Sequence, residues 1–196
     1  SWIKQKTIPA KNIDHAFEIF ETTLDSTYSV AWIDCLSSGN NLGRSLIMLG
    51  EHAEISDLKS DMKKKPLALK NKFKIRVPFN FPSFILNSFT IRLFNSLYYL
   101  LGKKKKGYKL VDYDTFFYPL DYFLDWNKFY GQKGFAQYQC VIPLNNALKG
   151  IRELLEKISH SNSNSFLAVL KRFGKQESYL SFPIEGYTLA LDFPIT

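Results

Sequence analysis

The most regular pattern in the sequence lies in its last third. Residues 134–143 are typical of a β-strand, and a helix opened by Asn145 or Asn146 follows, in which apolar residues recur at helical spacing. Residues 165–171 and 187–193 are then typical of two further strands. A strand, a helix and two strands in this order predict an antiparallel sheet with helices packed mainly on one face. The predicted fold class is therefore α+β.

The first third of the chain has a similar organisation. Asn12 is a typical N-cap for a helix with one apolar face, formed by Ile13, Ala16, Phe17, Phe20 and Leu24. Residues 28–35 alternate like a strand, residues 38–44 form a polar loop that contains glycines, and residues 45–49 return as a second strand. With 196 residues in all, the chain is long enough for one compact domain with a core.

The segment 54–110 is more basic and aromatic than the rest and largely irregular. Lysines cluster at 63–65 and at 103–106, and residues 86–97 fit an amphipathic helix. Its apolar side consists of Leu86, Phe89, Leu93 and Leu97, and its polar side of Asn87, Ser88, Arg92, Asn95 and Ser96. The polar side excludes a membrane-spanning helix, which needs roughly 20 mostly apolar residues. We interpret the segment as an insertion in a single domain that covers residues 1–196.

The net charge of +8 points to an anionic partner. Basic tracts beside an aromatic amphipathic helix are typical of proteins that bind an anionic membrane surface, although solvated loops give the same pattern. Nucleic acid is less favoured as a partner, because no recognition motif accompanies the charge. A non-enzymatic basic module that binds a membrane surface is thus one alternative function.

Few residues show the spacing of a metal site or of a known catalytic motif. The two cysteines, Cys35 and Cys140, are far apart and predict neither a metal site nor a disulfide framework, which is usual in a reducing compartment. The three histidines, His15, His52 and His160, are scattered, so we predict no bound metal and no catalytic triad.

Three polar residues on the predicted strands are candidates for a site. Gln137 and Gln139 share one face of a strand, where two carboxamides can bind a polyol without adding charge. An ordinary polar outer face is the competing interpretation. Lys171 ends the apolar run 166–170. Its ammonium either marks a solvated strand end or lies in a pocket, where it would stabilise an oxygen that becomes negative.

Several short segments, taken jointly in their order and spacing, resemble the substrate-binding domain of decaprenylphosphoryl-β-D-ribose oxidases. These enzymes are the flavin subunit of a 2′-epimerase and belong to the vanillyl-alcohol-oxidase class of FAD-linked oxidases. The segments are YSVAWID at 28–34, LGRS at 42–45, GEHA at 50–53, FYPLD at 117–121, WNKFYG at 126–131, GFAQYQ at 134–139, FLAVLKRFG at 166–174, LSFPIEG at 180–186 and DFPI at 192–195.

This resemblance implies a bacterial enzyme of cell-envelope biosynthesis. It implies hydride transfer from C2′ of a polyprenyl-phosphate pentose to FAD, which gives a ketone that a short-chain dehydrogenase partner then reduces to complete the epimerisation. The FAD-binding domain would come from sequence on both sides of this chain, whose ends we interpret as cuts through a larger protein. We therefore expect these residues alone to bind FAD weakly and to be inactive, and the whole protein to be cytoplasmic, in peripheral contact with the inner membrane.

The resemblance also assigns site residues by position. Lys171 corresponds to the catalytic position, and Gln137 and Gln139 to positions that bind sugar hydroxyls, with Gln139 and Lys171 close to the flavin ring. Further substrate-binding positions are Asn95, Phe117, Tyr118, Thr188 and Ala190. Three of these depart from the mycobacterial pattern, which has Tyr, Asn and Cys where this chain has Phe117, Thr188 and Ala190. Because polar or reactive groups are lost, oxidation of a soluble aldonolactone or alcohol is a second alternative.

Overall fold

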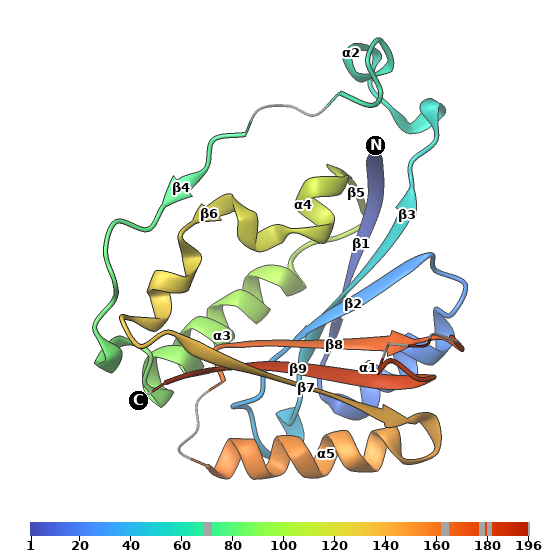
Figure 1. Ribbon diagram of the computed structural model, residues 1–196. Helices are drawn as coiled ribbons and strands as arrows, with labels where there is room; N and C mark the ends of the chain where they lie inside the picture. The colour runs from blue at the N-terminus through green and yellow to red at the C-terminus, as the bar shows by residue number, and fades with distance from the viewer. Residues whose placement is uncertain (69–71, 162–164, 177–178, 180–181, 196) are drawn as a thin grey trace.

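The main feature of the computed structural model is a seven-stranded sheet with the order β5-β1-β3-β2-β8-β9-β7, in which all neighbouring strands are antiparallel (Figure 1). The structure describes residues 1–68, 72–161, 165–176, 179 and 182–195. The strands of the sheet are β1 (Trp2–Ala10), β2 (Tyr28–Ile33), β3 (Ser45–His52), β5 (Tyr108–Asp112), β7 (Phe135–Pro143), β8 (Leu167–Phe173) and β9 (Gly186–Pro194). The helices are α1 (Ile13–Thr22), α2 (Ser60–Lys63), α3 (Ser88–Lys103), α4 (Tyr113–Phe117) and α5 (Leu144–His160), and two short strands, β4 (Ile75–Arg76) and β6 (Phe123–Leu124), pair separately. The predicted α+β class is confirmed.

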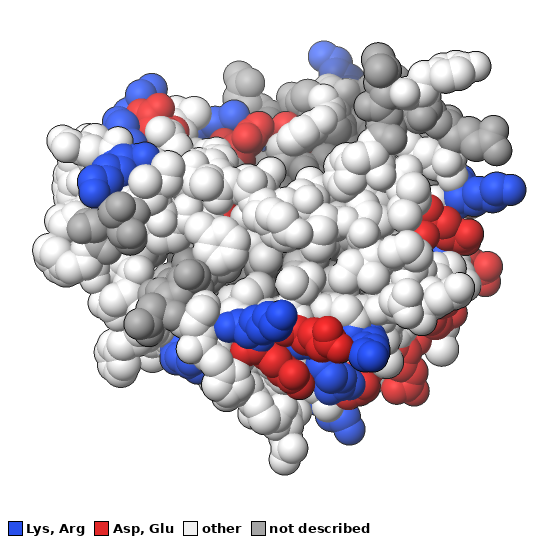
Figure 2. All heavy atoms as spheres, turned by 60° about the horizontal axis from the view of Figure 1, so that its bottom comes forward, with Lys and Arg blue, Asp and Glu red and all other residues white. Residues whose placement is uncertain are grey.

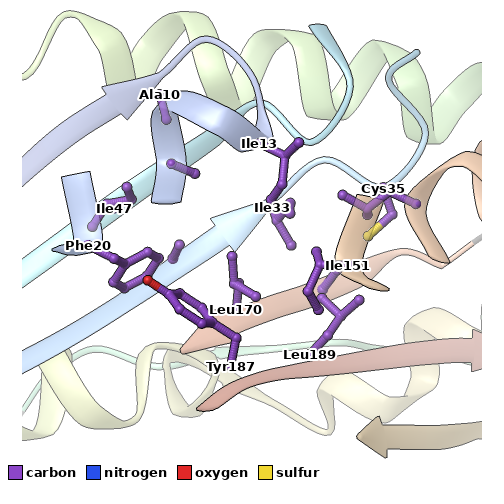
Figure 3. Packing of buried hydrophobic residues seen from close by; sticks show 14 of the residues in the cluster. Ala10, Ile13, Phe20, Ile33, Cys35, Ile47, Ile151, Leu170, Tyr187 and Leu189 are labelled. Atoms are coloured by element: carbon purple, nitrogen blue, oxygen red, sulfur yellow. The ribbon is translucent and has the colours of Figure 1, made fainter. Parts of the chain in front are cut away.

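Helices α1 and α5 cover one face of the sheet and enclose the core. Alternate strand residues project toward them, among them Ala31. Leu170 and Leu189, which Figure 3 labels, project the same way. The ring of Tyr187 stacks on Phe17 of α1 at 4.0 Å between centroids. The predicted cap of α1 is confirmed, since the side chain of Asn12 accepts a hydrogen bond from the backbone N–H of His15.

Helices α3 and α4 lie on the opposite face, but they cover only the strands at one end of the sheet. The ring of Tyr98 on α3 meets Trp32 at 4.8 Å, and Gly102 lies so close to Leu46 that any Cβ there would clash. On α4, the ring of Phe116 packs directly over Gly50 of β3. Strands β7 and β8 keep half-buried and exposed side chains on this face, and on β9 Ala190 is half-buried whereas Thr188 and Asp192 are buried. We call this part of the sheet, on the side away from α1 and α5, the open face.

Several sequence predictions need correction. Strand β1 was not predicted, because its polar stretch Lys4–Thr7 hides the alternation of a strand that is paired on both edges. Leu24 lies beyond the end of α1 and is 52% exposed. Helix α5 begins at Leu144, one residue before the predicted asparagines, after an extended Pro143. Part of the predicted loop at 161–164 and of the quoted segment 180–186 lies outside the described residues.

Candidate functional site

The open face brings together most of the candidate residues of β7, β8 and β9. Gln139 pairs with Ala190 in the register of β7 and β9, and Lys171 pairs with Thr188 in the register of β8 and β9. Directly paired residues of antiparallel strands project to the same face about 5 Å apart. Gln137 lies two residues along β7 from Gln139 and therefore shares this face.

Both carboxamides are held by side chains of β9. The Nε2 of Gln139 donates to the Oγ1 of Thr188 at 3.0 Å, and the Nε2 of Gln137 donates to an Oδ of Asp192 at 2.8 Å. In the described part of the chain, neither amide carbonyl oxygen has a hydrogen-bond partner, and both glutamines are exposed. The face therefore offers two neighbouring acceptors to a ligand with hydroxyl groups.

Lys171 lies at the exposed end of the same face. Its neighbour Arg172 projects to the other side of the sheet and binds Glu21 of α1 at 3.1 Å. Continuing the register of β2 and β8 by one residue brings Val30 beside Lys171. An exposed ammonium can bind an oxygen that carries negative charge. A ligand that lies across β9 could meet this ammonium on β8 and the carbonyl acceptors of the two glutamines on β7.

Phe117 borders the open face, whereas Tyr118 points away from it. The ring of Phe117 meets that of Tyr28 at 4.9 Å, and Tyr28 lies on the same face of β2 as Val30. Tyr118 is 55% exposed. It lines a surface pocket together with Lys72 and with Asp114 and Thr115 of α4. The structure therefore groups Phe117, and not Tyr118, with the three main candidates.

Comparison with known proteins agrees with the resemblance found in the sequence. No family model matches the chain. Over 181 residues, which are 92% of this chain, the sequence is 37% identical to a protein of Mycolicibacterium smegmatis named decaprenylphosphoryl-β-D-ribose oxidase. The chain is homologous to part of this oxidase. The match spans only 39% of the relative's length.

Asp192 belongs to the same face as Gln137, Gln139 and Lys171, although the sequence analysis did not select it. Its carboxyl group is buried and accepts hydrogen bonds from Gln137 and, at 3.4 Å, from the hydroxyl of Tyr130. Burial raises its pKa, and the two hydrogen bonds oppose that effect only in part. Only the register of β7 and β9, which no local pattern specifies, reveals that Asp192 orients a candidate ligand-binding side chain.

Asparagine at position 192 is expected to stabilise the protein increasingly as the pH rises from 4 to 7. The folded state holds the proton of Asp192 to a higher pH than the unfolded chain does, so its contribution to stability is lost as the pH rises through the raised pKa. Melting temperatures of the full-length Asp192→Asn variant and the wild type at several pH values test this. Asp57→Asn is the control of opposite sign, because a hydrogen bond from Lys4 lowers the pKa of Asp57. A gap between Asp192→Asn and wild type that is constant with pH would contradict the assignment.

Asn95 lies apart from the open face. Its side chain is 2% exposed and its Nδ2 donates to an Oδ of Asp34 at 2.8 Å, at the end of β2. Asp34 in turn binds Arg44 at 2.8 Å, and Arg44 donates to Ser96 of α3 at 2.9 Å. This buried network, which sequence reasoning missed, attaches α3 to the sheet. The position of Asn95 argues for a structural role and against direct contact with a ligand.

Metal-ligand clusters and membrane-spanning helices are absent from the described ranges. Within them, no group of three or more His, Cys, Asp or Glu side chains is arranged to hold a metal ion. None of the helices described there is long and apolar enough to cross a bilayer. Cys35 and Cys140 are free thiols, and burial strongly raises the pKa of Cys35.

Proposed function

We propose that this chain is the substrate-binding domain of an FAD-dependent oxidoreductase that oxidises C2′ of a polyprenyl-phosphate pentose to a ketone. The observation that supports this most directly is the open face, on which two unpartnered amide carbonyls of β7 and one exposed ammonium of β8 flank β9. The relationship to an oxidase named for a lipid-phosphoryl ribose adds the substrate class.

The residues of the open face fit one side of a planar flavin ring. On β9, Ala190 pairs with Gln139 of β7 on one side and with Val169 of β8 on the other. Because the side chain of Ala190 is small, the centre of this row across the face lacks a bulky side chain. Gln139 and Lys171 would hold the ring or the substrate above this row. Because the chain spans 39% of its relative, the parts of FAD other than the ring would be bound by sequence outside it. The flavin would supply the hydride acceptor.

The chain's own residues would bind and polarise the sugar. The carbonyl oxygens of Gln137 and Gln139 would accept hydrogen bonds from hydroxyl groups, with Asp192 and Thr188 holding both carboxamides in that orientation. The ammonium of Lys171 would stabilise the reacting oxygen as it gains negative character. Phe117 would form the wall of the site beside Tyr28.

The ketone would be consumed by a reductase, so we also propose a short-chain dehydrogenase partner in the cytoplasm. Reduction from the opposite side of the ring would complete a 2′-epimerisation. A lipid-linked substrate also requires access to the membrane.

Anaerobic reduction of the flavin tests the proposed function. The full-length protein, loaded with FAD, is expected to lose its flavin absorbance when mixed with a polyprenyl-phosphate pentose, and not with soluble aldonolactones or alcohols. Gln139→Leu is expected to slow this reduction about tenfold, as loss of a hydrogen bond to a reacting substrate does. Tyr138→Leu is the matched control, since Tyr138 is exposed on the same strand but projects to the other face.

Two outcomes would contradict the proposal. Reduction by soluble substrates alone would support the second alternative, an oxidase of aldonolactones or alcohols. Full-length protein that binds no flavin would support the non-enzymatic alternative.

A further inference from the structure

Helix α3 turns an apolar side outward and packs on the sheet through a mixed side. The outward side carries large apolar residues with exposures between 53% and 75%, namely Phe89, Leu93, Leu97, Leu100 and Leu101. The buried residues of the inward side are Ile91, Asn95 and Gly102, and the exposed Arg92 donates a hydrogen bond to the carbonyl of Leu36. A surface helix of a globular protein normally turns a polar side to the solvent. The sequence pattern predicted the amphipathic helix correctly but did not indicate which side packs.

The exposed residues form one continuous stripe. They recur at intervals of three or four, which brings them onto one side of a helix. With 16 residues, α3 is about 24 Å long, and the stripe runs along most of it. Phe94, 42% exposed, widens it. Contiguous apolar patches of this size on a protein surface usually mark an interaction site.

The segment around α3 has an extreme charge composition. Residues 62–111 contain no Asp or Glu. Their basic residues are Lys63, Lys64, Lys65, Lys70, Lys72, Lys74, Arg76, Arg92, Lys103, Lys104, Lys105, Lys106 and Lys109. This is more positive charge than the net +8 of the whole chain, so the remaining residues are net negative. Lys103–Lys106 directly follow the stripe and are all exposed.

The exposed side of α5 provides a contrast within the same molecule. Figure 2 turns that side of the molecule forward and shows Lys and Arg side chains interspersed with Asp and Glu in a band. Mixed charges of this kind are typical of a helix that faces water. Helix α3 has neither the mixed charges nor the polar outer side.

We propose that α3 is an interfacial helix that docks the protein on an anionic membrane surface. The apolar stripe would enter the boundary between headgroups and acyl chains, and Lys103–Lys106 would bind anionic headgroups. A membrane is favoured over a protein partner because the cores of protein–protein interfaces are depleted of lysine. This inference does not depend on the proposed oxidase activity, since it rests on the exposure and charge of α3 alone.

Docking through α3 would bring the open face near the bilayer. The inward side of α3 contacts Trp32, which pairs with Val169 at the border of the open face. The ring of Phe94 also lies 5.4 Å from that of Phe166, which directly precedes β8. A membrane-bound ligand would therefore reach the open face over a short path.

Sedimentation of the full-length protein with lipid vesicles tests the proposal. Wild type is expected to bind vesicles that contain phosphatidylglycerol and to bind pure phosphatidylcholine vesicles at least about tenfold more weakly. The double variant Leu93→Asp/Leu97→Asp and the quadruple variant with Lys103–Lys106 changed to glutamine are each expected to lose at least about tenfold in affinity for the anionic vesicles. Matched controls are Leu24→Asp, an exposed leucine after α1, and Lys149→Gln on α5, neither of which is expected to change binding.

A labelling experiment separates membrane docking from burial under another protein surface. Leu97→Cys is treated with a maleimide in the full-length protein, and the modified peptide is identified by mass spectrometry. Rapid labelling without vesicles and protection by anionic vesicles are expected. Slow labelling without vesicles would mean that the rest of the protein or a second copy covers α3, and would overturn the proposal. Unchanged vesicle binding in both α3 variants, with circular dichroism confirming that they fold, would overturn it as well.

Discussion

Lys171→Ala is expected to slow flavin reduction in the full-length protein by at least about tenfold, which corresponds to about 1.4 kcal/mol of transition-state stabilisation. Lys171 is exposed on the open face and pairs with Thr188, the residue that holds the carboxamide of Gln139. Its ammonium is thus the cation that this group of side chains offers to an oxygen gaining negative charge. Stopped-flow measurement of flavin absorbance under saturating substrate gives the rate directly.

Two further variants identify the source of this effect. Lys171→Arg keeps the positive charge and is expected to recover part of the rate, whereas a purely structural role would be indifferent to charge. Lys149→Ala removes an exposed lysine from α5, on the other side of the sheet, and is expected to leave the rate unchanged. An unchanged rate in Lys171→Ala would remove Lys171 from the site.

The elements with local signals could be predicted from the sequence. Strands β7, β8 and β9 alternate or form short apolar runs, and α1 has both a cap residue and a regular apolar face. The shared face of Gln137 and Gln139 follows from the two-residue period of a strand, which needs no tertiary information. These predictions succeeded because neighbouring residues along the chain determine them.

The remaining features depend on contacts between distant segments. Which side of α3 packs inward depends on contacts with distant residues, among them Asp34 and Arg44, which lie more than fifty residues earlier in the chain. The pairing of Gln137 with Asp192 likewise depends on a register across 55 residues. A helical wheel gives the two sides of a helix but not the surface that each side meets. The resemblance to the oxidase family pointed to Gln137, Gln139, Lys171 and Thr188, but not to Asp192, which holds the carboxamide of Gln137.

The attachment of α3 is expected to fail when its buried anion is removed. Asp34 is 1% exposed and accepts hydrogen bonds from Arg44, Asn95 and the backbone N–H of Leu36. Asp34→Ala would leave a partly buried guanidinium and a buried carboxamide without their acceptor. Removal of one partner from a buried ion pair typically costs about 3–5 kcal/mol. We therefore expect α3 to open at least about a hundredfold more often, which hydrogen exchange of its backbone amides in the full-length protein measures.

The same measurement on α5 and on a surface variant shows whether the loss is local. Amides in the middle of α5 are expected to keep their protection, because this part packs on the other face of the sheet, whereas Ser159 near its end accepts a hydrogen bond from Arg92 of α3. Asp57→Ala breaks a surface ion pair with Lys4, and pairs of this kind contribute little to stability. Equal exchange of α3 in Asp34→Ala and Asp57→Ala would mean that the apolar contacts of Ile91 and Tyr98 alone hold the helix. In that case the orientation of α3 would need a cause other than its buried polar contacts.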